Sequence, residues 1–129
     1  MHPNVVRLET FLDAYAARDV PGIRDCLADE AVWHVGGTHR LSGDYQGVSA
    51  ILEYFEQVGE ETGGTLHLER LELIANDERG AAFLRVVGER GDHQLDVTMA
   101  EAFQFDDTGR IKEFWAHATD QDAINRFWG

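Results

Sequence analysis

The sequence contains little cysteine and proline, no long hydrophobic run and few basic residues. Its single cysteine, Cys26, excludes an internal disulfide and a Cys/His zinc site, and it fits the reducing cytoplasm, where we expect the protein to act. The short apolar runs exclude a transmembrane helix, and the N-terminus lacks the basic and apolar stretches of a secretory signal. The formal charge of −13 disfavours nucleic acid and anionic membranes as partners, because phosphates bind to clustered Lys and Arg.

Sequence motifs for bound cofactors are also missing. There is no glycine-rich dinucleotide fingerprint, P-loop or nucleophile elbow, and the six histidines lack the spacing of metal ligands. We therefore expect no cofactor and no metal. A 129-residue chain that is 43% hydrophobic and 27% charged is typical of a globular protein. Because no repeat or Pro/Ser-rich linker interrupts it, we predict a single domain over residues 1–129.

Helical spacing of apolar residues predicts three helices in the first half of the chain and a short helix at its end. They are expected at about residues 4–18, within residues 18–31, from Val48 to near Gly63–Gly64, and within residues 119–129. Asp19 fits the N-cap of the second helix, and Pro21 suits its first turn, where a missing N–H costs little. Thr119 and Asp122 form a variant of the capping box before the last helix.

Alternating apolar residues predict the strands. A short strand is expected at residues 31–35, followed by a turn-rich loop at 36–47, and four long antiparallel strands are expected at 65–75, 81–90, 93–105 and 110–118. Helices first and strands afterwards indicate an α+β fold, in which a curved sheet of four or five strands wraps the helices on one side. The other face of the sheet must then meet solvent or a second subunit.

One strand face carries an unexpected carboxylate. Along residues 95–105, Glu101 shares its face with large apolar residues only, which are Leu95, Val97, Met99, Phe103 and Phe105. Burial there should raise its pKa unless Arg85 or a histidine lies close. A perturbed carboxylate in a cleft marks a functional site, whereas the structural interpretation is a buried ion pair that holds the sheet.

The length of the hairpin loop decides which residues lie opposite Glu101. A four-residue loop at 106–109 pairs Glu101 with Phe114 and places Ala116 and Ala118 on the same face, where their small side chains leave open volume. A three-residue loop with a bulge shifts the pairing by one residue and brings in instead the neighbours Trp115 and His117.

Three segments resemble the nuclear-transport-factor-2-like superfamily, and within it the SnoaL-like and ketosteroid-isomerase-like proteins. They are AARDVPGIRDCLADEAVWHVGG, LSGDYQGVSAILEYF and AFQFDDTGRIKEF. The resemblance implies a cystatin-like α+β barrel, that is, a cone-shaped curved antiparallel sheet wrapped around three N-terminal helices, with a pocket inside. It also favours the four-residue hairpin loop. Because the superfamily includes isomerases, polyketide cyclases, epoxide hydrolases, dehydratases and noncatalytic proteins, the fold alone does not give the function.

Most functional positions of these relatives are not kept. By the resemblance, Val35 replaces the general-base aspartate of ketosteroid isomerase, and Phe11 replaces its oxyanion-hole tyrosine, with Tyr15 one turn further on. Only Glu101 matches, at the position of the protonated aspartic acid that donates to the substrate oxygen. The catalytic aspartate of the polyketide cyclases aligns near Ala116. The named chemistries therefore do not carry over.

The candidate catalytic residues are Glu101 and His34, an imidazole that could exchange a proton with the carboxyl. Strict alternation turns His34 away from the apolar face, whereas a bulge in its strand would bring it into the pocket. We expect the substrate-binding residues to be Phe11, Tyr15, Trp33, Tyr54, Phe55, Met99, Phe114, Ala116 and Ala118.

Two functions fit these residues. The first is a cofactor-independent enzyme that performs acid/base chemistry, as an isomerase, cyclase, dehydratase or hydrolase, on a small polyketide- or terpenoid-like molecule. The second is a noncatalytic module that binds a small hydrophobic molecule. In the favoured register, Trp115 and His117 lie on the outer sheet face, and an exposed tryptophan there predicts a homodimer.

Overall fold

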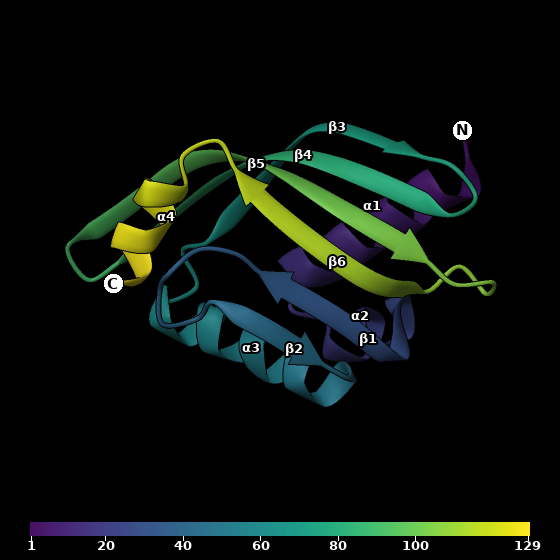
Figure 1. Cartoon of the computed structure of the whole chain (residues 1–129), viewed down its shortest axis with the longest axis horizontal. Coiled ribbons are helices and arrows are strands. Elements are labelled where there is room, and N and C mark those ends of the chain that lie inside the picture. Colours follow the sequence, from purple (N-terminus) through teal and green to yellow (C-terminus); the bar gives the residue numbers. More distant parts are fainter.

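The computed structural model describes residues 1–129 and has the expected α+β architecture (Figure 1). The helices are α1 (Pro3–Ala17), α2 (Val20–Cys26), α3 (Val48–Glu61) and α4 (Gln121–Trp128). The strands are β1 (Leu27–Val35), β2 (Gly43–Gln46), β3 (His67–Ala75), β4 (Arg79–Arg90), β5 (His93–Phe105) and β6 (Ile111–Ala118). No helix is both long and apolar enough to cross a membrane.

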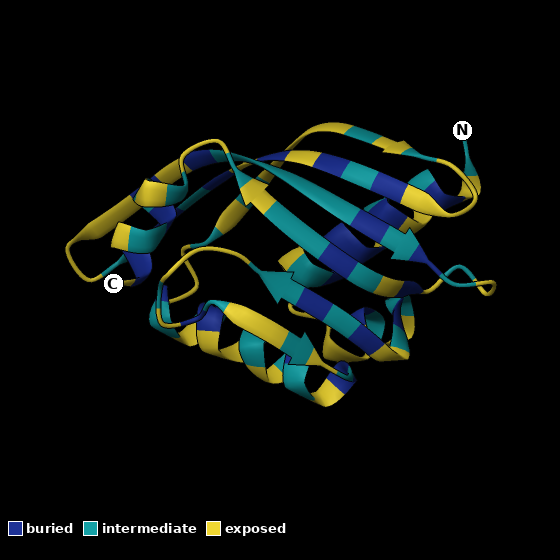
Figure 2. Cartoon of the chain, viewed as in Figure 1, coloured by how far each residue is buried: buried dark blue, intermediate teal, exposed yellow.

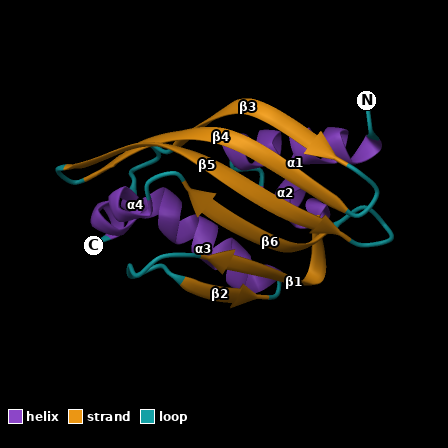
Figure 3. Cartoon of the chain, turned by 45° about the horizontal axis from the view of Figure 1, so that its top comes forward, coloured by secondary structure: helices purple, strands orange, loops and turns teal.

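The six strands form one curved sheet in the order β2-β1-β6-β5-β4-β3. Neighbouring strands are antiparallel except β1 and β6, which run parallel. Figure 3 shows α1, α2 and α3 on the same side of this sheet, while α4 lies at one end, where it contacts β5. The concave face and the helices thus enclose the interior, and α4 covers an end that the other helices leave open.

The structure corrects the prediction for the segment around the first strand. Strand β1 begins at Leu27, four residues before the expected start, and it is irregular against β6 between Leu27 and Val32. Residues 43–46, which were expected in a loop, form the edge strand β2 and pair with β1. These four residues are rich in turn formers and show no clear alternation of apolar and polar residues. They form a strand because the free edge of β1 offers unpaired backbone groups with which they can pair.

Carboxylates cap two helices. Asp19 accepts the N–H of Gly22 at 3.1 Å, as predicted for the start of α2. The prediction for α4 was wrong by one residue, because Asp120 and not Thr119 is the N-cap and accepts the N–H of Ala123 at 3.0 Å. Asp and Thr are both preferred at the N-cap, so the sequence did not show which of the two residues caps α4.

An aromatic cluster fills the core between α1 and the sheet. Trp33 and Phe114, from the parallel pair β1 and β6, stack at 3.7 Å between ring centroids with an angle of 8° between the planes. Phe11 and Phe103 pack against this pair at 5.7 and 5.2 Å. Figure 2 shows buried residues alternating with more exposed ones along the central strands. This cluster forms one wall of the site described next.

Candidate functional site

The hairpin of β5 and β6 determines what surrounds Glu101. Glu101 pairs with Ala116, two residues beyond the expected Phe114, because the register shifts through a bulge next to Phe105 and Ile111. A shift of two residues keeps every side chain on its expected face, whereas a shift of one would have exchanged the faces. The register that brings Trp115 next to Glu101 is therefore excluded.

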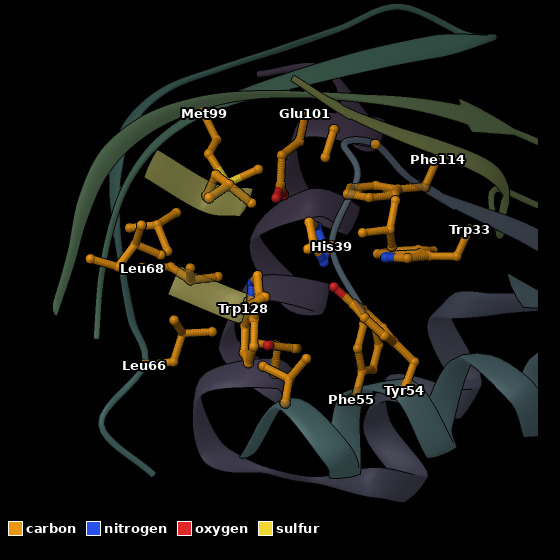
Figure 4. Close-up of a pocket in the computed structure, with 18 of the residues that line it drawn as sticks. Trp33, His39, Tyr54, Phe55, Leu66, Leu68, Met99, Glu101, Phe114 and Trp128 are labelled. Carbon is orange, nitrogen blue, oxygen red and sulfur yellow. The ribbon is translucent and has the colours of Figure 1, made fainter. Parts of the chain in front are cut away.

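A cavity of about 110 Å³ lies between the concave face and the helices. Seventeen of its 21 lining residues are hydrophobic, so a molecule that fills it must be largely apolar. Figure 4 shows Met99, Glu101 and Phe114 reaching in from the sheet, with Tyr54 and Phe55 reaching in from α3 on the opposite side.

Eight of the nine expected substrate-binding residues line this cavity, and their contact with a substrate stays a prediction. They are Phe11, Tyr15, Trp33, Tyr54, Phe55, Met99, Phe114 and Ala116. Ala118, the ninth, does not line it. It lies on the same strand face as Ala116 and pairs with Met99 at the end of β6.

Glu101 is the only carboxylic acid that lines the cavity. Burial raises its pKa to about 8, because an apolar environment disfavours the carboxylate more than the neutral acid. No side chain or backbone group forms a hydrogen bond with its carboxyl. Arg85, which could have paired with it, instead forms a two-pronged ion pair with Asp96 on the other face of the sheet, at 2.7 and 2.9 Å. The interpretation of Glu101 as half of a buried ion pair is therefore wrong.

Two tyrosines place further polar atoms near this carboxyl. Burial raises the pKa of Tyr15 and of Tyr54, and the charge of Glu101 raises both further. Such an influence requires proximity, because charge interactions weaken with distance. Neither hydroxyl has a hydrogen-bond partner, in contrast to Tyr45, which donates to the carbonyl of Leu41 at 2.7 Å. The cavity thus holds a carboxyl with a raised pKa and two hydroxyls without hydrogen-bond partners in a largely apolar wall.

His34 does not join this group, contrary to the prediction. Its imidazole lies on the outer face of β1, between the carboxylates of Asp44 at 2.6 Å and Glu113 at 2.7 Å. It also stacks on Trp115, with 5.5 Å between ring centroids. Strict alternation with the buried Trp33 turns it outward, and the bulge of β1 comes too early in the strand to reverse it.

The pKa of His34 should therefore lie above its ordinary value. The hydrogen bonds to Glu113 and Asp44 raise this pKa, and stability from the ion pairs should be present at low pH and lost as the pH rises through the raised pKa. NMR titration of the imidazole should show this rise in the wild-type protein. In the variants Glu113→Gln and Asp44→Asn the pKa should move back toward 6.5, and an unchanged titration would contradict the assignment of these partners.

Sequence reasoning missed a group of lining residues from the 36–42 loop and from α4. They include Gly36, His39, Gln121, Ile124 and Trp128. His39 lies in this turn-rich loop, yet its Nε2 atom is buried. Only the apolar face of the terminal helix, with Ile124 and Trp128, gave a signal in the sequence. Nothing in the sequence places that helix over the pocket.

Outside the pocket, the outer sheet face carries Trp115 and His117 as expected for this register. Its role as a homodimer interface stays a prediction. No three His, Cys, Asp or Glu side chains come together as ligands of a metal ion would.

Comparisons with solved structures support the fold throughout the chain. Bal32a, from a soil-derived mobile gene cassette, is 31% identical with a TM-score of 0.93, over 98% of this chain and 96% of that one. A cystatin-like protein of unknown function from Xanthomonas campestris is 20% identical with a TM-score of 0.92, over 99% of both chains. SMa1630 from Sinorhizobium meliloti, a candidate polyketide cyclase, is 22% identical with a TM-score of 0.69, over 90% of this chain and 95% of that one.

Sequence comparison gives the same assignment. A search of curated proteins found no significant match. The SnoaL-like domain family, however, matches residues 8–114, which include α2, α3, the first five strands and the first half of β6. Together with the 31% identity to Bal32a over nearly the whole chain, this match shows that the chain belongs to the SnoaL-like domain family.

Proposed function

We propose that this protein is a cofactor-independent enzyme in which Glu101 transfers a proton to or from a small hydrophobic carbonyl compound. The observation that carries the proposal is the carboxyl of Glu101, which has a pKa of about 8 and no hydrogen-bond partner inside an apolar cavity. A group that titrates near the working pH is the most effective proton-transfer catalyst. Near neutral pH the acid form donates a hydrogen bond to a carbonyl oxygen, and the carboxylate fraction accepts a proton from the adjacent carbon.

The walls of the cavity support an apolar substrate of limited size. A cavity of about 110 Å³ is comparable with engineered cavities of about 150 Å³ that bind benzene, so a single small ring fits. A second, larger cavity of about 960 Å³ adjoins it, and Tyr15 and Phe55 line both. A longer apolar molecule could therefore keep its reacting ring beside Glu101 and extend past these two side chains. The fold similarity to a candidate polyketide cyclase agrees with a substrate of this kind.

Proton exchange at the carbon next to a carbonyl group tests the proposal with a simple ketone in place of the natural substrate. Cyclohexanone is incubated with the protein in D₂O, and deuterium incorporation is followed by NMR. We expect catalysed exchange that falls by about 100-fold or more in Glu101→Gln, because a positioned acid or base contributes that much. Glu72→Gln is the matched control, since Glu72 is exposed on β3.

The pH dependence of the exchange rate identifies the active form. A rate that rises through about pH 8 assigns the carboxylate as the base, and a rate that falls there assigns the neutral acid. A rate that does not change with pH near this value, or an equal rate in Glu101→Gln, would contradict the proposal.

A noncatalytic binding module is the second candidate. It is favoured by the absence of another carboxylic acid from the cavity lining and of any hydrogen bond that would activate Glu101. In that case ligands bind, Glu101→Gln keeps the affinity, and no compound in a panel of cyclic ketones exchanges protons faster than in buffer.

A further inference from the structure

Arg18 is the only residue other than glycine that has a positive φ angle in this chain. It ends α1 in the left-handed conformation, with a φ of 53° and a ψ of 37°. Glycine is the usual residue at such a helix end, because it has no Cβ atom to strain the backbone. The seven other positions with positive φ are all glycines. A side chain kept at a strained position calls for a function of that side chain.

The guanidinium of Arg18 lines the second cavity, of about 960 Å³, and has no partner in the protein. Two glycines near the end of α3 leave room for it, since a Cβ atom would lie 2.7 Å from its Nη2 on Gly64 and 3.7 Å on Gly59. The arginines that bind a carboxylate are Arg40, Arg70, Arg85 and Arg90. Arg18 forms no ion pair and no side-chain hydrogen bond, so its N–H donors are free for a ligand.

The other charges of the second cavity are divided between its walls. Three exposed glutamates of α3 line it, namely Glu53, Glu56 and Glu60, and none of them forms an ion pair with Arg18. Arg70 also lines the cavity, but Asp13 pairs with it. The carboxylates of α3 repel an anion and the free arginines attract it. An anionic group in this cavity is therefore expected beside Arg18 rather than along α3.

The side chains between the two cavities place Arg18 near the candidate site. Those that line both cavities are Leu12, Tyr15, Phe55, Val58, Leu66 and Leu68. Figure 4 shows Phe55 and Leu66 across the pocket from Glu101. Burial raises the pKa of the Tyr15 hydroxyl, the charge of Glu101 raises it further, and the charge of Arg18 lowers it. Because charge interactions weaken with distance, this hydroxyl lies within reach of both groups.

We propose that Arg18 binds the carboxylate of a ligand whose apolar ring occupies the first cavity beside Glu101. The ligand class is an oxo acid, in which a methylene chain joins a cyclic ketone to a terminal carboxylate. The planar guanidinium matches a carboxylate with two parallel hydrogen bonds. The methylene chain passes between the mostly apolar side chains that line both cavities. This inference rests on the proposed function, because it adopts the carbonyl ring beside Glu101 and adds a charge at the other end of the molecule.

Three oxo acids of different length test the proposal, each compared with its own primary amide. They are (4-oxocyclohexyl)acetate, 4-(4-oxocyclohexyl)butanoate and 6-(4-oxocyclohexyl)hexanoate. Affinities at neutral pH are measured from NMR shift changes. At least one carboxylate should bind the wild type about fivefold more tightly than its amide, which corresponds to a strong exposed ion pair. In Arg18→Gln this preference should disappear, while the affinity for the amide changes less than about twofold.

Two further variants separate the guanidinium from the total charge of the protein. Arg79→Gln removes an exposed arginine without an ion pair at the start of β4, and it should behave as wild type. Arg18→Lys keeps the charge but not the planar fork, so it should keep part of the preference. Equal affinity of the wild type for every carboxylate and its amide, or an unchanged preference in Arg18→Gln, would overturn the proposal.

Arg18→Gly separates ligand binding from a structural role. Glycine adopts the left-handed conformation without strain, so this variant should keep or raise the melting temperature and lose the preference for the carboxylate. If the guanidinium instead serves only to stabilise the negative end of the α3 dipole, the melting temperature falls and the preference stays, which contradicts the proposal.

These binding measurements need no turnover, so this inference and the proposed function can fail separately. If Glu101 catalyses proton exchange of cyclohexanone but no carboxylate is preferred, only the role of Arg18 is wrong. If a carboxylate is preferred and no ketone exchanges protons faster than in buffer, only the catalytic function is wrong.

Discussion

Replacement of Glu101 by glutamine is expected to raise the free energy of unfolding by about 4 kcal/mol at pH 9 and to leave it nearly unchanged at pH 4. The unfolded carboxyl ionises near its ordinary value of 4.5, whereas in the native protein it stays protonated up to about pH 8. Between these two values the unfolded state binds fewer protons than the native state, so the stability of the wild type falls as the pH rises. Glutamine does not titrate, and its variant avoids this loss.

Urea unfolding across this pH range, followed by fluorescence of the three tryptophans, measures the effect. His34 also loses stabilising ion pairs as the pH rises, so the difference between wild type and Glu101→Gln is the relevant quantity. Glu72→Gln, on the exposed side of β3, should follow the wild-type curve. If the curves of wild type and Glu101→Gln stay parallel from pH 4 to pH 9, the pKa of Glu101 is not raised in the native state.

A Glu101 pKa that is not raised would argue against the catalytic function but not against the binding function. A pKa near the working pH makes Glu101 an effective proton-transfer group, whereas a ligand can be held by a carboxyl of any pKa. The stability curve therefore tests the premise of the catalytic proposal in the absence of any substrate. It also connects function with a cost in stability, since a site that keeps an unpaired acid in an apolar cavity is less stable than one with a neutral amide.

The sequence predicted which face of β5 carries Glu101, although the predicted pairing of β5 with β6 was wrong. The expected pairing with Phe114 was two residues from the observed pairing with Ala116, yet side chains in a strand repeat every two residues and the faces stayed correct. The helices were likewise predicted, since their apolar spacing and caps such as Asp19 are local signals.

What the sequence could not predict depends on contacts between distant segments. Strand β2 exists because residues 43–46 find the free edge of β1, and no local pattern of four residues specifies such pairing. His39 enters the cavity because its loop is bonded to α4, which is more than 80 residues further along the chain. The role of His34 required a choice between alternation and a bulge, and the structure shows that alternation decided it.

The open volume opposite Glu101 depends on Ala116, and Ala116→Leu is expected to abolish ligand binding. Ala116 lines the cavity and pairs directly with Glu101. A leucine adds three carbon atoms to a cavity of about 110 Å³, and it fills apolar space that is otherwise empty. We expect the affinity for cyclohexanone and the exchange rate to fall by about 100-fold or more, since displacement of a reactant by about 1 Å already has an effect of that size.

Stability separates this effect from misfolding. Filling an apolar cavity without strain preserves or raises the melting temperature, whereas overpacking lowers it. Ala118→Leu is the matched control, because Ala118 lies on the same face of β6 but outside the cavity, and it should keep binding and exchange. If Ala116→Leu folds and still binds cyclohexanone with wild-type affinity, the ligand does not occupy the space beside Glu101. Glu101 would then be a buried acid without a substrate, and both proposals for this cavity would fail together.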